Sequence, residues 1–487
     1  MGAGAGERVR RVSAAELAQH SSSGDAWVRI GARVYDVSRW LHAHPGGETV
    51  LLNHAGRDAT HAFASFHAPH AASKSLAPLE VGEAAWDVSC AADEDFKALR
   101  AQLEAEGLFS PTVRFYAAQA AWLAALFALV LALTAADSAA LRVAGGVALG
   151  IFWQQAAFVG HDAGHAGITG RRRVDQAIGL LCGNCLTGIE IGWWQATHNI
   201  HHTTPNSAEH DADVQHLPFM AVSEAFLQGV FSRFHNDRME CWPAQRRMLA
   251  WQHWYFFPIL TVARYGLLLQ GIKTVGWEWG KRHTGFGSPN SRWTRVVEAA
   301  ALAVFYGYAG ALLARLPCAA ERLAFTYLSG ATFAILHLQI NLSHWSQRVL
   351  PGAPPGGWVD TQLAATLNWS CPPWLDWCVQ SGACVGLLTL VHACSDSFLS
   401  QVSWRVAVPD RAPLVPTAAA RASAARGAAR ARAVRPPRRA VPAAGLRGGD
   451  GRDLGHAAAR GACRSCHGPT QRPVKTKHLY SPLLCVR

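Results

Sequence analysis

Four long apolar stretches constrain the fold of this chain more than any other feature of its sequence. They cover residues 115–135, 138–160, 297–316 and 322–342, and few charged side chains interrupt them. A helix of about 20 residues, rising about 1.5 Å per residue, crosses the roughly 30 Å hydrocarbon core of a bilayer. The sequence therefore predicts an all-α integral membrane domain with four transmembrane helices, arranged as two hairpins.

A fifth apolar stretch is of a different kind. Residues 251–269 are apolar but contain Arg264, so we expect this segment to lie at the membrane interface or to re-enter the membrane from one side.

Charges near the hairpins predict which side of the membrane each end occupies. Residues 171–173 are three arginines that follow the first hairpin, and basic residues near membrane spans mark the cytosolic side. The chain opens without an apolar signal segment, so we expect the N-terminus in the cytosol. Because each hairpin crosses twice, both termini and residues 175–290 are expected on that same side.

Two groups of histidines lie beside the apolar stretches. His161 and His165 are spaced i, i+4, and His198, His201 and His202 are spaced so that they share one face of a helix. One such pair is often no more than a solvated or hydrogen-bonded structural feature. Two groups together favour a metal site, because imidazole is a ligand that suits iron, zinc and copper.

Residues 10–85 read as a separate small α+β domain. Ser13 and Glu16 form a capping box that opens a helix, and residues 26–30 and 33–37 predict two strands around a Gly-Ala turn. The stretch His44-Pro-Gly-Gly resembles the haem-binding core of cytochrome b5, although a turn with incidental histidines would look similar. The resemblance implies haem b with His44 and His67 as axial ligands, or His70 in place of His67. Two axial imidazoles leave no position for oxygen, so such a haem transfers electrons.

The two histidine groups together with this domain resemble the front-end fatty acyl desaturases that carry a fused cytochrome b5 domain. The resemblance implies two non-haem iron ions, which activate oxygen and remove two hydrogens from an acyl chain. The implied iron ligands in the two groups are His161, His165, His198, His201 and His202.

The resemblance also implies a further ligand on the last membrane helix, where His337, Asn341 and His344 share one face. We favour His344, with Asn341 as an outer or water-bridged ligand. His337 reads equally well as an interfacial polar residue. His210 and His216 are expected outside the ligand set or on the surface.

Family membership would also imply partners and a location. Expected partners are a membrane-lipid acyl substrate, the bilayer and an NADH-cytochrome b5 reductase as electron source, in the endoplasmic reticulum membrane. A sphingoid-base delta-8 desaturase, a lipid hydroxylase and a membrane-anchored b5 electron carrier remain alternatives. The sequence does not fix the double-bond position within the delta-5/6/8 type, nor whether the acyl chain is linked to a glycerolipid or to CoA.

One motif of the family is missing. A third box, Gln-x-x-His-His, should follow Asp376 and Trp377, but none occurs downstream. Codons compatible with residues 402–417, read from the second base, permit that box, and compatible splice boundaries enclose one base plus 24 codons, or 73 bases. We infer a retained intron over residues 378–401 and an out-of-frame, disordered tail over residues 402–487.

The remaining boundaries are the linker 86–111 and the membrane domain 112–377. The net charge of +12 belongs to the tail alone. Of 45 basic and 33 acidic residues, the tail holds 17 and 3, which leaves 28 and 30 for the rest. The charge is therefore no indication of nucleic-acid binding. The 12 cysteines show no disulfide framework and are expected to be reduced.

Overall fold

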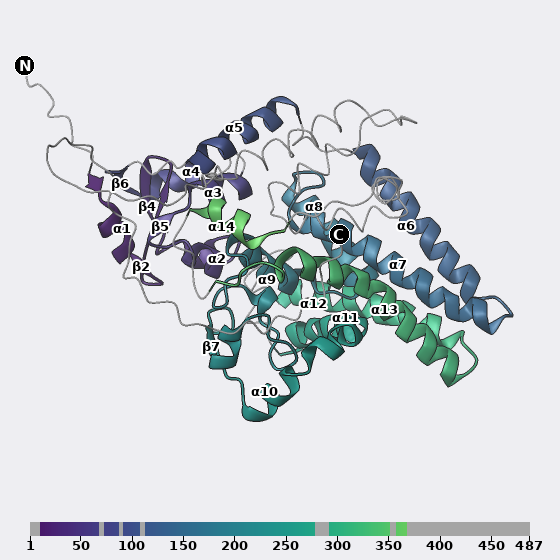
Figure 1. Ribbon diagram of the computed structural model, residues 1–487. Helices are drawn as coiled ribbons and strands as arrows, with labels where there is room; N and C mark the ends of the chain where they lie inside the picture. Colours follow the sequence, from purple (N-terminus) through teal and green to yellow (C-terminus); the bar gives the residue numbers. More distant parts are fainter. Residues whose placement is uncertain are drawn as a thin grey trace, which may run out of the picture. The chain divides into compact units, whose positions relative to one another are not determined.

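The computed structural model describes residues 10–67, 73–86, 91–107, 113–277, 292–350 and 357–367 (Figure 1). The inferred intron, the inferred out-of-frame tail and His70 lie outside these residues.

The N-terminal domain is built on a mixed sheet of six short strands. They pair in the order β1-β6-β4-β3-β2, with β5 beside β3. The strands are β1 (Arg11–Val12), β2 (Ser21–Ser22), β3 (Asp25–Ile30), β4 (Arg33–Asp36), β5 (Arg57–Asp58) and β6 (Glu80–Ala84). The β3–β4 hairpin confirms the two strands expected here, and its turn uses Gly31 at φ 64°.

Short helices flank this sheet. They are α1 (Ala14–Gln19), η1 (Leu41–Ala43), α2 (Glu48–Leu52), α3 (Thr60–Phe66), α4 (Ser73–Leu76) and η2 (Ala77–Leu79). The capping box is present: the Glu16 N–H donates to Ser13 Oγ, and the Glu16 carboxylate accepts from the Ser13 N–H. Val28, Val37 and Leu41 form the core between the sheet and the helices that carry the histidines.

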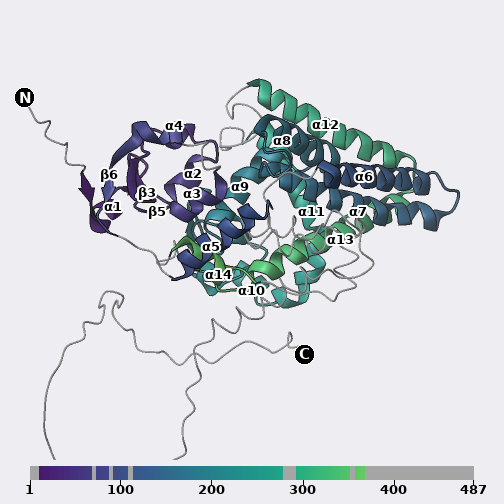
Figure 2. The same cartoon turned by 90° about the horizontal axis from the view of Figure 1, so that it is seen from above.

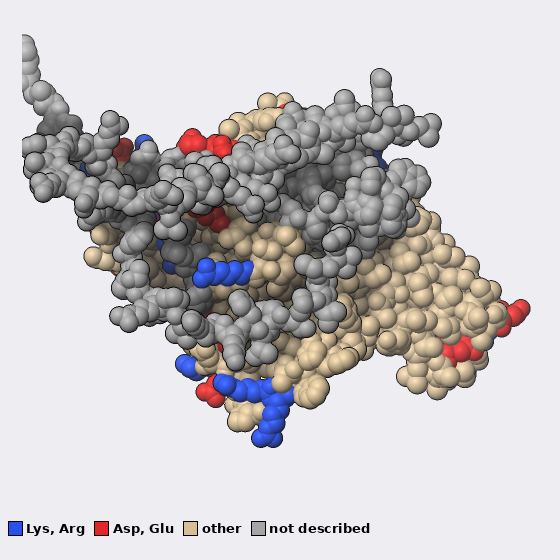
Figure 3. Space-filling view, viewed as in Figure 1, with Lys and Arg blue, Asp and Glu red and all other residues tan. Residues whose placement is uncertain are grey.

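Two helical hairpins form the apolar part of the molecule. The first consists of α6 (Val113–Thr134) and α7 (Ala139–Gly164), and the second of α12 (Arg292–Ala314) and α13 (Ala319–His344). Helix α7 packs against both α6 and α13, and the three run side by side in two views (Figures 1 and 2). Few charged side chains appear on the visible surface of these hairpins (Figure 3). Helices suit a bilayer because they satisfy every backbone hydrogen bond internally.

Small residues let α7 and α13 approach closely. A Cβ added at Gly146 would lie 2.5 Å from the Phe325 carbonyl oxygen, and one at Gly150 would lie 2.6 Å from the Ser329 carbonyl oxygen. Close backbone contact at small residues is the usual way in which helices pack within a bilayer. The crossing matters for the site because α7 ends at the first histidine group and α13 ends at His344.

Helix α11 (Gln252–Gly276) is one continuous helix, where the sequence predicted an interrupted apolar stretch. With it, five helices of the described residues are long and apolar enough to cross a membrane. Arg264 is fully buried, and its guanidinium lies 3.8 Å from the Trp153 ring centroid and 4.5 Å from that of Phe333. The charge therefore faces an aromatic cage and does not interrupt the helix.

Both ends of α11 contact the end of the bundle that carries the histidines. At its start, Gln252 exchanges hydrogen bonds with the backbone of Ala221, in the loop that follows the second histidine group. At its other end, Arg295 donates to the Val275 and Gly276 carbonyls. Arg295 lies at the start of α12, which in the antiparallel hairpin is the end where α13 finishes. The expectation that this segment lies at the membrane interface or re-enters the membrane stays a prediction.

The segment between the hairpins leads into the second histidine group. It begins with α8 (Arg172–Gly179), a π-helix η3 (Leu180–Thr187) and α9 (Ile191–Thr203). The smaller elements that follow are η4 (Ala212–Val214), η5 (Glu224–Gln228), β7 (Val230–Ser232), β8 (Asp237–Met239) and α10 (Pro243–Leu249). Two further helices lie outside this segment, α5 (Ala91–Ala105) in the linker and α14 (Trp358–Ala365) after α13.

Candidate metal sites

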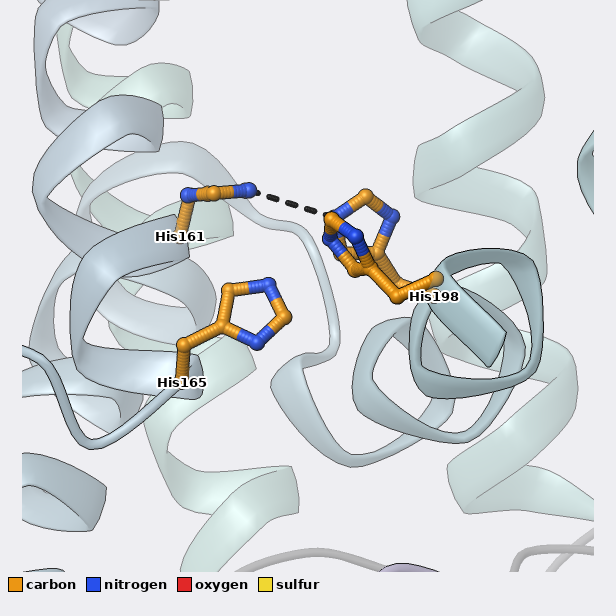
Figure 4. Close-up of side chains that lie close together, drawn as sticks. His161, His165 and His198 are labelled. Atoms are coloured by element: carbon orange, nitrogen blue, oxygen red, sulfur yellow. Dashed lines mark hydrogen bonds between the residues drawn. The ribbon is translucent and has the colours of Figure 1, made fainter. Parts of the chain in front are cut away.

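The end of α7 and the middle of α9 bring four histidines together. His161 lies in the last turn of α7 and His165 directly follows this helix, and both lie opposite His198 of α9 (Figure 4). His202, one turn after His198 on α9, completes the group. His198 Nε2 lies 3.1 Å from His161 Nε2 and 2.8 Å from His202 Nε2. All four side chains offer a ring nitrogen within 4.8 Å of the others.

The sequence before α9 fixes the direction of that helix. Gly188, at φ 72°, ends the π-helix, and a Cβ there would lie 2.6 Å from the Phe305 ring. Glu190 then caps α9, since its fully buried carboxylate accepts from the backbone N–H groups of Gly192 and Trp193. Asn184 reaches across from the π-helix, and its Oδ1 accepts from the Ile191 N–H. These contacts orient α9 so that its histidines lie opposite those at the end of α7.

The four-histidine group fits a cation better than a hydrogen-bond network. A ring nitrogen carries either one proton or one lone pair, so His198 Nε2 does not form good hydrogen bonds to two other ring nitrogens at once. In addition, His165 Nε2 and His202 Nδ1 are buried without a hydrogen-bond partner. A metal ion among the four rings would use the lone pairs that the protein leaves facing one another.

Burial keeps these imidazoles in the form that binds metal. The pKa values of His165, His198 and His202 lie well below their ordinary range, because burial disfavours the charged ring and the neighbouring histidines add repulsion. A neutral imidazole is the species that coordinates a metal. The site is therefore ready for a cation at neutral pH.

A second pair of histidines lies next to the first group. His201, on α9, and His344, at the end of α13, place their Nε2 atoms 3.3 Å apart. The Nδ1 of His201 bonds to Asp211 at 2.8 Å, and the Nδ1 of His344 donates to the Ala365 carbonyl at 3.2 Å. Both side chains are buried. The pair therefore presents two Nε2 atoms to a second metal position.

The other polar residues predicted near α13 lie elsewhere. His337 is half-buried beside Phe333, with ring centroids 5.3 Å apart, and is not among the histidines that converge. Asn341 is buried one turn before His344, and its role as an outer or water-bridged ligand stays a prediction. His210 is buried and bonds to Ser207 Oγ at 3.0 Å, whereas His216 is exposed and packs on Trp345.

Carboxylates around the histidines were not predicted. Asp162 lies 3.3 Å from His161 Nδ1 and accepts from the Tyr116 hydroxyl, and Asp213 lies 3.4 Å from His198 Nδ1. Asp211 and Asp213 follow the second group by about ten residues, in a run of mixed polar residues. Their closeness to the second group was the only signal available, because the loop that folds them back has no regular pattern.

The N-terminal domain holds a separate histidine pair. His44 and His67 face each other with ring centroids 6.1 Å apart. The Nδ1 of His44 donates to the Gly47 carbonyl and that of His67 to the Phe63 carbonyl, both at 3.0 Å. A Cβ at Gly46 would lie 2.9 Å from the His44 ring, so the turn needs glycine there.

These two imidazoles fit the axial positions of a haem. Their Nε2 atoms are left for a metal because their Nδ1 atoms are bonded to the backbone. Burial lowers the pKa of both rings, so they are neutral at pH 7.

Comparison with known families agrees with this division of the chain. Residues 13–85 match the family described as cytochrome b5-like heme/steroid binding domain. Residues 137–381 match the family described as fatty acid desaturase.

Individual desaturases are similar to large parts of the chain. The chain is 38% identical to "Delta(8)-fatty-acid desaturase 2" of Arabidopsis thaliana over 376 residues, which are 76% of this chain and 80% of the relative. It is 33% identical to "Acyl-lipid (9-3)-desaturase" of Borago officinalis, over 75% of this chain and 80% of the relative. A shorter match, 35% identical over 47% of this chain and 42% of the relative, is to "Delta 8-(E)-sphingolipid desaturase" of Emericella nidulans.

Proposed function

This chain belongs to the fatty acid desaturase family and carries a cytochrome b5-like domain, and from that membership we propose that it is a front-end desaturase of membrane-lipid acyl chains. It is an oxidoreductase and a membrane protein whose family uses a di-iron centre and a haem. Within the delta-5/6/8 type, the names of the similar plant proteins favour the delta-8 position.

The convergence of histidine ring nitrogens from three helices carries the proposal. His161, His165, His198 and His202 would hold one iron, and His201 and His344 would supply ligands to the other. When bound, the two irons supply oxygen activation and the removal of two hydrogens from an unactivated acyl chain. The protein contributes imidazole ligands whose rings are already oriented by contacts at Nδ1 in His161, His198, His201 and His344.

His44 and His67 would be the axial ligands of the haem. Because two imidazoles would fill both axial positions, the haem would pass electrons and leave oxygen chemistry to the histidines of the other domain. The electron source would be an NADH-cytochrome b5 reductase. The interaction requires that the b5 domain faces the same compartment as the reductase.

We propose that the membrane is that of the endoplasmic reticulum, with both termini in the cytosol. The three arginines after the first hairpin support this orientation. A glycosylation tag inserted near residue 210 should stay unmodified, whereas a tag in the short loop at residues 135–138 should be glycosylated if that loop can reach the modifying enzyme. Glycosylation near residue 210 would overturn the orientation.

A sphingoid base is the second candidate substrate. The shorter match to a sphingolipid delta-8 desaturase favours it specifically. An acyl chain and a sphingoid base carry different head groups. Analysis of the host's acyl chains and long-chain bases therefore shows which of the two has gained the double bond.

We further propose that the third box has been lost from this chain by a retained intron over residues 378–401. The family match ends at residue 381, close to that boundary, which supports the proposal. For the polypeptide as it stands, a membrane-anchored b5 electron carrier is therefore the alternative from another functional class. The inferred tail, residues 402–487, would have no role in the chemistry.

The test of the function is expression in a host that makes no front-end desaturated lipids. The coding sequence without the inferred 73 bases should yield a new double bond in the acyl chains or the long-chain bases of the host lipids. A variant with His198→Ala should yield none. A correctly inserted, haem-containing protein that produces no new double bond in either lipid class would contradict the proposal.

A further inference from the structure

The loop after the second histidine group folds back onto both histidines of the second pair. Asp211 is fully buried, and its Oδ2 accepts from His201 Nδ1 at 2.8 Å and from the Asn206 N–H at 2.8 Å. Its Oδ1 accepts from the Asp213 N–H at 2.9 Å. The carboxylate thus connects the His201 ring to the backbone of its own loop.

Asn206 makes the matching connection to the other histidine. Its Nδ2 donates to the backbone carbonyl of His344 at 2.7 Å and to that of Ala365 at 3.2 Å. The same Ala365 carbonyl accepts from His344 Nδ1. Asn206 is fully buried at φ 56°, a left-handed conformation that asparagine adopts more readily than most residues.

His201, Asp211 and Asp213 each offer a ligand atom within 4.8 Å of the others. The contact of Asp211 with the His201 ring nevertheless favours a positioning role over a ligand role. Its contact is to Nδ1, whereas Nε2 of His201 faces His344. A carboxylate that accepts from Nδ1 holds the imidazole in the tautomer whose Nε2 carries the lone pair. Asn206 holds the end of α13 at the distance that brings the second Nε2 opposite the first.

We infer that Asp211 and Asn206 are a pair of positioning residues that build the second metal position, the one formed by His201 and His344. At the first metal position the corresponding contacts are longer. Asp162, which accepts from the Tyr116 hydroxyl, lies 3.3 Å from His161 Nδ1. There, Asp213 lies 3.4 Å from His198 Nδ1, and its side chain is about one-third exposed, at 32%. The two positions thus differ in how firmly their histidines are oriented. This inference rests on the proposed ligand role of His201 and His344.

Zinc is a suitable probe because it binds imidazole, does not change oxidation state and needs no turnover. The full chain with its haem, purified in detergent and freed of adventitious metal with a chelator, is dialysed against graded Zn²⁺. The zinc content per haem should rise in two events, a tighter one at the four histidines and a weaker one at His201 and His344.

The variant Asp211→Asn should weaken the second event by about 10- to 100-fold and leave the first within about twofold. Asn206→Gly tolerates the same backbone conformation but loses both side-chain hydrogen bonds, so it should weaken the second event as well. Asp213→Asn is the matched control, because it should weaken the first event and spare the second. The melting temperature of each variant separates selective loss of zinc from general unfolding.

Three kinds of outcome would overturn the inference. If His201→Ala removes the second event but Asp211→Asn and Asn206→Gly leave it unchanged, the positioning role is wrong and the ligand role stands. If His201→Ala leaves both events intact, or if the native chain shows only one event, the ligand assignment is wrong and the positioning role falls with it. Equal weakening of both events by Asp211→Asn in a protein of normal melting temperature would also contradict it.

Discussion

Histidines of both domains use their Nδ1 atoms in the same way. In His44 and His67 the Nδ1 atom donates to a backbone carbonyl, and in His201 it bonds to a carboxylate. In each case Nε2 is the atom that remains for a metal. The sequence predicted which histidines would gather but not which nitrogen each would present. That choice depends on partners such as the carbonyl of Ala365, which lies 21 residues from His344.

A first prediction concerns the haem ligands. His44→Ala in the full chain should abolish the low-spin, bis-histidine haem spectrum in absorption and electron paramagnetic resonance, because one axial ligand is lost. His67→Ala should do the same. His42→Ala is the control, since this exposed side chain is two residues away and bonds to Glu48 at the surface. A normal spectrum in the His67→Ala protein would move the second ligand to His70.

A second prediction concerns stability in acid. Burial, with smaller contributions from Arg233 and Arg57, lowers the pKa of His210 to about 4. In the unfolded chain the same ring titrates near 6.5, so below that pH the unfolded state binds more protons. Above about pH 6.5 the ring does not lower the free energy of unfolding. As the pH falls from 6.5 toward 4 the free energy of unfolding decreases, and the loss is about 2 kcal/mol at pH 5.

His210→Gln should therefore reduce the drop in melting temperature between pH 7 and pH 5. The exposed His253 provides the control substitution, because His253→Gln should leave that drop unchanged. The same pH dependence in the native chain and in the His210→Gln variant would show that the ring is protonated in the folded state.

At the scale of the elements, the sequence located the four helices of the two hairpins to within about five residues at each end. The stretch 138–160 became α7, which continues to Gly164, and the stretch 322–342 became α13, which continues to His344. The extension matters, because it places the histidines on the helices themselves. Helix α11 was the exception. Its Arg264 looked like a break in an apolar run, and only the rings of Trp153 and Phe333 from two other helices explain how the charge is accommodated.

The π-helix η3 could not have been predicted from its residues. Its residues alone favour no particular helix type, and its shape is fixed by partners from distant elements. Arg264 donates to the Thr187 carbonyl and Tyr308 to the Leu186 carbonyl, so α11 and α12 bind the end of η3. Cationic and polar donors at a helix C-terminus satisfy its last carbonyl groups.

A third prediction tests the crossing of α7 and α13. Gly150→Leu should force the two helices apart and destabilise the protein by about 1–3 kcal/mol or more, because a Cβ at this position already meets backbone atoms. The melting temperature in detergent measures this. Gly307→Leu is the control, since a Cβ at that glycine of α12 meets nothing within 4 Å. Equal melting temperatures for the two variants would refute the close crossing.

At the scale of the whole molecule, the four-histidine group and the His201–His344 pair are an incomplete ligand set for two irons. The described residues bring four histidines to one position and two to the other. Ferrous iron sits low in the affinity order of divalent metals, so a position with two imidazoles should hold it weakly. The missing third box would complete that position.

A fourth prediction follows for the whole chain. Expressed as it stands, it should bind haem, reach the membrane and desaturate nothing. The version without the inferred 73 bases should desaturate the host lipids, and both versions should be compared by lipid profiling at equal haem content. Equal activity of the two would show that the third box is dispensable or supplied elsewhere. A transcript that keeps these bases throughout would count against the intron.

The close crossing of α7 and α13 lies far from the histidines at the ends of these helices, so a small rotation at the crossing would displace those histidines. From Gly150 to His161 the helix runs about 16 Å, and from Ser329 to His344 about 22 Å. A rotation of about 5° at the crossing would move either end by roughly 1 to 2 Å, and a displacement of about 1 Å at reacting groups can reduce a rate about a hundredfold. A methyl group added at this crossing would thus displace histidines at the far ends of the two helices, although it does not contact them.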